Sequence, residues 1–191
     1  CEKGDVPSVS KKTGALVAFN ATQFDSQYLF FKSLKGAFRI EGEDVSAPVE
    51  KYAAFVFENK AEGGRAIVCD IVEKQTEEAL ALWKNVVGGF FVVLKDGNVV
   101  DFPFLSYRAR VGLGLDEERK TMYVLIVEEK NSTGLSYPQC GYLFKALGYS
   151  DAMEFDGGRS TALYVKGKNA LASYPWRKAL NAIVVFCDCL Q

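Results

Sequence analysis

Residues 146–165 read ALGYSDAMEFDGGRSTALYV, and the expected fold is built around this stretch. The Leu-Gly pair at 147–148 is typical of a helix end, because glycine readily adopts the left-handed conformation beyond the last turn. Residues 153–156 then predict a short strand, and a second short strand follows at 162–165. Between them lies an Asp-Gly-Gly turn, in which two glycines allow the backbone to reverse sharply and to approach a ligand closely.

This turn also gathers chemical groups that could bind a substrate. The carboxylate of Asp156 would project from the end of the strand, with Arg159 and the Ser160 hydroxyl beside it. The amides of Gly157 and Gly158 would be exposed in the same loop. An acid, a cation and free amides together can bind a polar, partly anionic molecule. Asp-Gly-Gly also occurs in turns without a function, so an ordinary turn is the alternative interpretation.

Pairs of apolar segments separated by turn residues run along most of the chain. The expected hairpins join residues 53–57 with 66–71, 90–94 with 98–102, 110–115 with 121–128, and 162–165 with 170–172. Helices are expected at 76–85 and 136–147, and single strands at 15–19 and 179–186. This pattern predicts a single α+β domain, a mostly antiparallel sheet of hairpins with a few packed helices.

Composition excludes several classes of function. A net charge of −1 argues against a nucleic-acid partner, which requires a basic surface to neutralise phosphates. The chain contains no histidine, which rules out Ser-His-Asp and Cys-His catalysis and every zinc site that uses histidine. No pair among the five cysteines has CxxC spacing. Acid–base chemistry is therefore left to Asp, Glu, Lys, Tyr or Cys, and anion binding to arginine.

The N-terminal segment suggests export. Cys1 stands where a methionine would be expected, as it does in a bacterial lipoprotein after its signal peptide is removed. Residues 1–14 would then be a flexible tether, and residues 15–191 the folded domain. On this interpretation the protein is exported to the periplasm or the cell surface and meets the membrane only through a lipid on Cys1. The alternative is that the sequence simply begins at an arbitrary boundary.

Other polar residues stand at the ends of expected strands. Arg108 and Arg110 would point to the same side of an extended chain, where paired guanidiniums can bind a phosphate. Asn20 and Asp25 bracket the loop after the first strand. Taken separately, these residues fit a solvated strand edge or turn equally well. Two more polar residues lie just before and inside the last strand, namely Arg177 and Asn181.

Taken in order, these segments resemble the phosphodiester glycosidase family, whose known activity removes N-acetylglucosamine from phosphodiesters. Residues 20–25 align with a loop of the form Asn-Gly-Gly-Phe-Phe-Asp, and residues 108–112 with Arg-Thr-Ala-x-Gly. Residues 147–160 match a helix ending in Leu-Gly and a strand leading into Asp-Gly-Gly-Gly-Ser. Residues 177–181 match Arg-x-x-x-Asn. The resemblance is best from residue 108 to residue 186.

The chain departs from the family pattern at four positions. Ala21 and Thr22 replace the two glycines of the first loop. Arg159 replaces the third glycine of the Asp-Gly-Gly-Gly turn, where a long side chain could fill the pocket or add a phosphate contact. Glu154 stands where the family often has asparagine.

The resemblance implies hydrolysis of the bond between the anomeric carbon of a sugar and a phosphodiester oxygen, with no cofactor and no metal. It implies that Arg108 and Arg177 bind phosphate, and that Asp156 acts as a base or stabilises the positive carbon. The remaining substrate contacts it suggests are Asn20, Asp25, Glu154, Gly157, Gly158, Arg159, Ser160 and Asn181, with Asp25 or Glu154 as the second carboxylate. Two alternatives are a non-catalytic surface lipoprotein that binds glycan or protein, and a metal site at Asp156, for which the sequence offers no ligand spacing.

Overall fold

The computed structural model describes residues 2–28, 31–59, 67–103, 105–129, 133–172 and 181–185. The described strands form three five-stranded sheets and one two-stranded ribbon. All pairings among these strands are antiparallel. The prediction of a mostly antiparallel α+β fold is therefore confirmed. Cys1, Arg177 and the turn of the hairpin at 60–66 lie outside the described residues.

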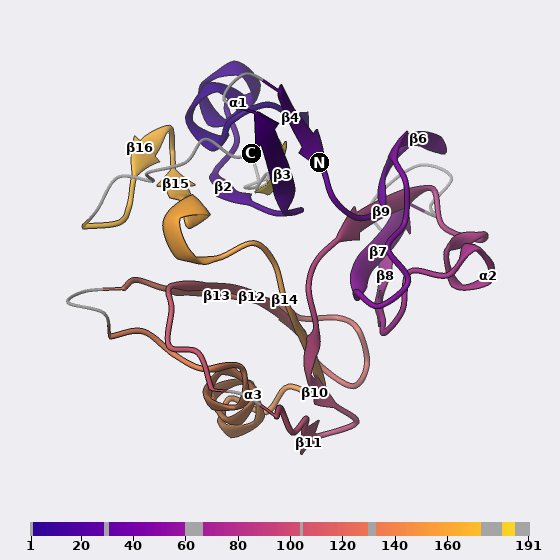
Figure 1. The fold of residues 1–191 in the computed structure, drawn as a ribbon, viewed down its shortest axis with the longest axis vertical. Coiled ribbons are helices and arrows are strands. Elements are labelled where there is room, and N and C mark those ends of the chain that lie inside the picture. Colours follow the sequence, from indigo (N-terminus) through magenta and orange to yellow (C-terminus); the bar gives the residue numbers. More distant parts are fainter. Residues whose placement is uncertain are drawn as a thin grey trace, which may run out of the picture.

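The first sheet, called here the terminal sheet, contains both the first and the last described strands. Its order is β1 (Glu2–Lys3), β17 (Asn181–Val185), β2 (Val17–Asn20), β15 (Leu163–Val165) and β16 (Lys168–Asn169). Helix α1 (Val6–Thr13) packs on its outer face, where Val6 and Val9 are buried against Ala18, Ala162 and Tyr164. This sheet and α1 occupy the upper part of Figure 1.

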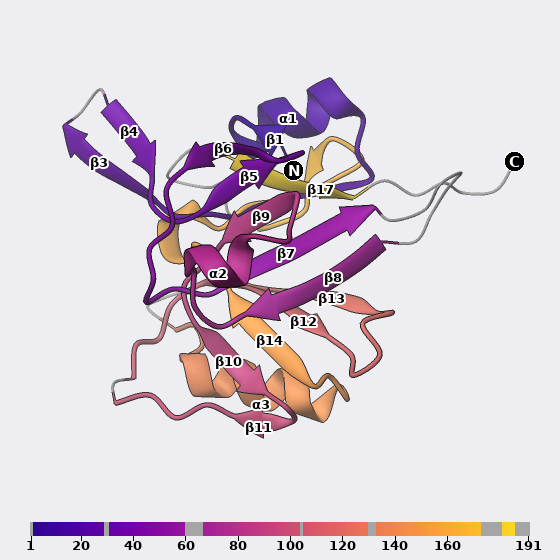
Figure 2. The same ribbon diagram turned by 90° about the vertical axis from the view of Figure 1, so that its right-hand side faces the viewer.

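The second sheet, called the hairpin sheet, contains the predicted hairpin of residues 53–71. Its order is β6 (Glu43–Ser46), β5 (Phe38–Ile40), β9 (Asn85–Gly88), β7 (Ala54–Asn59) and β8 (Ile67–Val72). Helix α2 (Glu77–Leu80) covers it by placing Leu80 against Val56 and Val86. The two-stranded ribbon of β3 (Phe24–Tyr28) and β4 (Phe31–Leu34) projects from the body of the molecule in Figure 2.

The third sheet, called the site sheet, leads directly into the Asp-Gly-Gly turn. Its order is β11 (Asn98–Val99), β10 (Val92–Lys95), β14 (Asp151–Glu154), β12 (Arg110–Leu115) and β13 (Met122–Val127). Helix α3 (Tyr137–Ala146) lies against its outer face. A Cβ on Gly114 would lie 2.6 Å from Phe144 of this helix, so the glycine is what allows the helix and strand to pack closely.

The three sheets enclose one shared hydrophobic core. The terminal sheet contributes Phe19, the hairpin sheet contributes Phe38 and Phe55, and the site sheet contributes Leu113 and Met153. The views in Figures 1 and 2 agree on this arrangement, with a helix outside each sheet. Burying each large apolar side chain contributes about 2 kcal/mol. This core fixes the three sheets relative to one another and so positions the loops that run between them.

Local signals for α3 and for one hairpin are confirmed. Ser136 caps α3 and forms a reciprocal capping box with Gln139. Gly148 follows the helix with a φ of +86°, as the Leu-Gly pair predicted. Asp96 and Gly97 both have positive φ, 46° and 73°, as a two-residue type I′ turn between β10 and β11 requires.

The helix predicted over residues 76–85 is wrong in its extent. Thr76 caps α2 as expected, but the helix ends at Leu80. Residues 85–88 instead form β9, in which Val86 and Val87 pair with β5 and β7 and are buried. Pairing on both sides of the strand outweighs the helical preference of the segment, because β-branched residues pack well on a pleated surface.

The prediction of a flexible tether is wrong for residues 2–13. β1 pairs with β17, and α1 is capped by Asp5, whose carboxylate accepts a hydrogen bond from the amide of Ser8. The apolar side of α1 is buried, with Val9 only 2 % exposed. Capping and burial together make this polar-looking segment part of the domain. In the part of the chain that is described, no helix has the length and apolar character needed to cross a membrane.

Candidate functional site

The Asp-Gly-Gly turn passes from the site sheet to the terminal sheet. It leaves β14, makes a single 3₁₀ turn at Gly158–Ser160 and enters β15. In Figure 1 it is the orange segment between β14 and β15. Gly157 must be glycine because an added Cβ would lie 2.5 Å from the carbonyl oxygen of Ala109. Gly158 has open space around it but a φ of +56°, which other residues adopt only with strain.

Backbone hydrogen bonds hold this turn against two other loops. The Asp156 amide donates to the carbonyl of Ala21 at 3.0 Å, just beyond the end of β2. The Gly158 amide donates to the carbonyl of Ala109 at 2.8 Å, just before β12. Three segments that are widely separated in sequence therefore meet at Asp156. Because the Gly158 amide is already bonded to Ala109, the prediction that this amide is free to contact substrate does not hold in this structure.

Asn20 holds the turn from inside the protein. Its side-chain amide donates to the carbonyl oxygen of Asp156 at 2.5 Å, and its side-chain oxygen accepts from the amide of Ala162 at 2.8 Å. Asn20 is completely buried, so the prediction that it contacts substrate does not hold either. A single side chain thus ties both ends of the loop together, and its role is to position Asp156.

The two arginines near the start of β12 lie in different environments. The Arg108 side chain is 58 % exposed and lies 3.9 Å from Glu129. Its backbone forms a bridge with Leu135, which precedes α3. Arg110 is only 6 % exposed and donates from Nε to the carbonyl of Leu135 at 2.8 Å. The expected pair of guanidiniums on one phosphate is therefore not formed, because only Arg108 faces solvent.

The other predicted site residues differ in how far their side chains are exposed to solvent. Arg159 is exposed, whereas Ser160 is only 4 % exposed. Asp25 forms an ion pair with Lys35 at 3.3 Å and remains about half exposed. Asn181 lies in β17, and its neighbour Ala182 pairs with Asn20. The backbone at the end of the Arg-x-x-x-Asn segment therefore runs beside the site.

Glu154 lies below the site, on the face of β14 that is covered by α3. It is completely buried, so it cannot be a second carboxylate that touches substrate, and the prediction of that role is wrong. Burial raises the pKa of Glu154 to about 7, while the Cys140 thiol and the Arg110 guanidinium partly oppose this rise. Within the described ranges, no group of three or more acidic or cysteine side chains is placed to hold a metal ion.

Comparisons with known proteins identify the family. A model of the phosphodiester glycosidase family matches residues 13–186. The chain belongs to the phosphodiester glycosidase family. Comparison with curated protein sequences gives no match.

Solved structures share the fold of this family member at low sequence identity. The catalytic domain of zebrafish N-acetylglucosamine-1-phosphodiester alpha-N-acetylglucosaminidase, auto-inhibited by its pro-peptide, matches with a TM-score of 0.76 and 16% identity. The match covers 97% of this chain and 67% of that one. A hypothetical protein from Synechocystis matches with a TM-score of 0.70 and 14% identity over 96% of this chain. This chain spans only 54% of the Synechocystis protein.

Several residues that shape this candidate site were not singled out from the sequence. Gly134 is required because a Cβ there would lie 2.2 Å from the carbonyl oxygen of Arg108. Ala109 and Ala21 hold the turn through their backbone carbonyl oxygens, which no side-chain pattern can indicate. Glu129 accepts from the Ala109 amide at 3.3 Å. Among these residues, only Gly134 carried a signal in the sequence, because a glycine within a polar segment can mark a close approach of two backbones.

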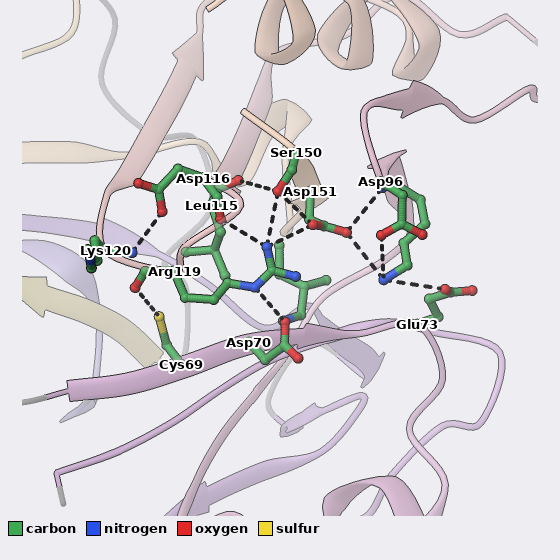
Figure 3. Close-up of polar contacts among 12 residues, drawn as sticks. Cys69, Asp70, Glu73, Asp96, Leu115, Asp116, Arg119, Lys120, Ser150 and Asp151 are labelled. Carbon is green, nitrogen blue, oxygen red and sulfur yellow. Dashed lines mark hydrogen bonds and ion pairs between the residues drawn. The ribbon is translucent and has the colours of Figure 1, made fainter. Parts of the chain in front are cut away.

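A second polar cluster lies at the opposite end of β14. Asp151 forms ion pairs with Arg119 at 2.8 Å and with Lys95 at 3.2 Å. Figure 3 shows Asp151 beside Arg119. Arg119 also contacts Asp70 of β8 at 3.0 Å. Burial alone would raise the pKa of Asp151, but hydrogen bonds from Ser150, Arg119 and Lys95 outweigh it and lower that pKa. Because these charges pair with one another across two sheets, the cluster fastens the site sheet to the hairpin sheet.

Proposed function

We propose that this protein hydrolyses a sugar-1-phosphodiester, releasing free sugar from a phosphorylated glycan or glycoconjugate. The observation that carries the proposal is the convergence at Asp156. The segments at Asn20–Ala21, Arg108–Ala109 and Asp156–Gly158 are those that resemble the family motifs, and hydrogen bonds join all three. Membership of the family supports the reaction class.

The proposed chemistry needs few groups. A phosphate is a good leaving group, so the enzyme must mainly stabilise its charge and bring water to an oxocarbenium-like carbon. Asp156 would act as a base toward that water or would stabilise the developing positive charge. Arg108 would bind the phosphate, because its side chain is exposed and the next residue, Ala109, is hydrogen-bonded to Gly158 of the Asp156 turn. Arg177 is a second proposed phosphate ligand from the family pattern.

Arg159 replaces the third glycine of the motif, and its side chain is exposed. We infer that it adds a cationic contact at the mouth of the site, since guanidinium groups bind phosphate oxygens well. The competing function is a non-catalytic protein that binds glycan through the same surface. Arg159 is the observation that favours this alternative, because a bulky side chain at this position could also block access to Asp156.

The test is turnover of a defined substrate. The purified protein would be incubated with an N-acetylglucosamine phosphodiester and with related sugar phosphodiesters. We expect free sugar and the matching phosphomonoester to form in equal amounts. The control substrate is the same sugar linked to a neutral nitrophenyl group, which lacks the phosphate and should react far more slowly. If no phosphodiester in the panel releases sugar, the hydrolase proposal fails and the binding function becomes the better account.

A further inference from the structure

Arg110, Cys140 and Glu154 form a buried cluster between the site sheet and α3. Glu154 pairs across the sheet with Gly112 of β12. A Cβ on Gly112 would lie 3.3 Å from Oε1 of Glu154, so the missing side chain leaves room for the carboxyl group. Cys140 faces the carboxyl from α3, and burial followed by the nearby carboxylate raises the pKa of its thiol. The carboxyl group therefore lies between β12 and α3, and Glu154 is completely buried.

The carboxyl of Glu154 is not satisfied by its surroundings. Neither oxygen has a hydrogen-bond partner among the described residues. The Cys140 thiol lies close enough to influence the carboxyl but does not complete a hydrogen bond of ordinary geometry. Leaving a carboxylate buried and unpaired is costly, so its charged form requires a cationic partner. Arg110 is the cation that acts on it.

Arg110 uses its hydrogen bonds elsewhere. It donates to the carbonyl of Leu135 at 2.8 Å and to the carbonyl of Ser106. Its guanidinium lies over the ring of Tyr137, 4.0 Å from the centroid. These contacts fasten residues 106–110 to the segment that leads into α3.

The fastened segment is the one that carries the candidate phosphate ligand. Arg108 exchanges backbone hydrogen bonds with Leu135 at 3.2 and 3.0 Å. The next residue, Ala109, accepts the hydrogen bond from Gly158. The carbonyl of Leu135 therefore accepts hydrogen bonds from the Arg108 amide and from the Arg110 side chain. A movement of Arg110 can shift this carbonyl, and with it Arg108 and the Ala109 carbonyl that holds the Asp156 turn.

We propose that Glu154 is a positioning residue that, once ionised, draws Arg110 away from the carbonyls of Ser106 and Leu135 and so loosens the segment that bears Arg108. A carboxylate is a stronger acceptor for guanidinium than a neutral carbonyl. The titratable or charged groups that face Glu154 are Arg110 from β12, and Cys140 and Tyr137 from α3. Only Arg110 can neutralise a negative charge.

The consequence for the proposed hydrolase is weaker substrate binding above neutral pH. This consequence rests on the proposed function, whereas the movement of Arg110 does not. The raised pKa of Glu154, about 7, places the change near neutrality. The sequence contains no histidine, so no imidazole titration obscures a change in this range. A phosphodiester remains singly charged over the same range, so the change would belong to the protein.

The direct test follows the arginine side chains without substrate. The Nε–Hε resonances of Arg108 and Arg110 would be recorded from about pH 5.5 to about pH 8.5, a range that brackets neutrality. They would be assigned by Arg→Lys variants. In the wild type we expect both signals to shift together with a midpoint near pH 7. In Glu154→Gln, and in Glu154→Asn, both signals should stay in place. Wild-type signals that do not move over this range overturn the proposal, whether or not the variants fold.

The second measurement connects the movement to substrate. For the wild type, KM for an N-acetylglucosamine phosphodiester should rise with pH by about tenfold, the effect of losing one hydrogen bond to a charged group. KM of Glu154→Gln should stay flat, and kcat should keep its wild-type pH profile. Glu118→Gln removes an exposed carboxylate in the β12–β13 turn and should leave the wild-type profile unchanged. An identical rise in KM in Glu154→Gln contradicts the proposal. If no phosphodiester is hydrolysed at all, the proposed function fails. The resonance shifts then test the proposed movement of Arg110 by themselves.

Discussion

The two glycines of the Asp156 turn are required for different physical reasons. Gly157 is needed because the backbone of Ala109 passes too close for any side chain. Gly158 is needed because its φ lies in the left-handed region, although space around it is open. The first constraint involves another segment of the protein, whereas the second is local. Substitution at the two positions should therefore lower the free energy of unfolding by different amounts.

We predict that Gly157→Ala destabilises the protein by about 2 kcal/mol or more, because the new Cβ must displace the Ala109 backbone. Gly158→Ala should cost about 1 kcal/mol, the strain of one residue in the left-handed region. Urea denaturation of the two variants measures the difference. Equal costs would mean that contact with Ala109 does not constrain the turn.

Signals that lie within one element of sequence predicted the elements well. The Ser136 cap, the Gly148 helix end and the Asp96-Gly97 turn all depend on neighbouring residues, and each is confirmed. Elements set by distant partners were missed. Residues 85–88 form a strand because they pair with β5 on one side and β7 on the other. The polar segment before Gly14 forms a helix because Val6 and Val9 are buried against the terminal sheet.

The site could be predicted to a similar degree. The sequence indicated which segments meet, because Asn20, Arg108 and Asp156 belong to a recognisable motif order. In the structure Asn20 is hydrogen-bonded to Asp156, and Ala109, the residue after Arg108, is hydrogen-bonded to Gly158. It could not separate exposed from buried side chains within those segments. Asn20, Arg110 and Glu154 are polar residues that would be expected on a surface, yet the protein uses them internally.

At the scale of elements, α1 should contribute to stability. Val9→Ala removes two buried methyl groups from the contact with the terminal sheet and should cost about 2 kcal/mol. Lys12→Ala, an exposed change on the same helix, should cost less than about 0.5 kcal/mol. Thermal unfolding of both variants measures this. A Val9→Ala protein as stable as Lys12→Ala would return residues 2–13 to the role of a tether.

At the scale of the whole molecule, two devices hold the sheets together. The shared apolar core supplies most of the attraction, and the Asp151 cluster joins the site sheet to β8 through Arg119 (Figure 3). Both ends of β14 are therefore fastened, one by ion pairs and the other by the hydrogen bonds of the Asp156 turn. This arrangement keeps the loop-bearing end of β14 in place relative to the other two sheets.

The Asp151 cluster should make stability depend on acidity. Because the folded pKa of Asp151 is lowered, its contribution is fully present above the unfolded value of 3.8 and is lost as pH falls through the folded value. Asp151→Asn should cost about 3 kcal/mol at neutral pH, since it leaves Arg119 and Lys95 without their buried partner. The difference between wild type and variant should shrink below about pH 4. A difference that is constant down to strongly acidic pH would contradict this account.

The central claim is that Asp156 carries the chemistry, and kinetic comparison of Asp156→Asn with wild type tests it most directly. Asparagine has nearly the same shape, so the hydrogen bonds of the Asp156 amide and carbonyl to Ala21 and Asn20 should remain. On an N-acetylglucosamine phosphodiester, kcat should fall by a factor equivalent to several kcal/mol while KM changes little, which marks an interaction made in the transition state. Asp44→Asn, the same substitution on the hairpin sheet, serves as the control. A folded Asp156→Asn protein that releases sugar at the wild-type rate would show that Asp156 is only a turn residue.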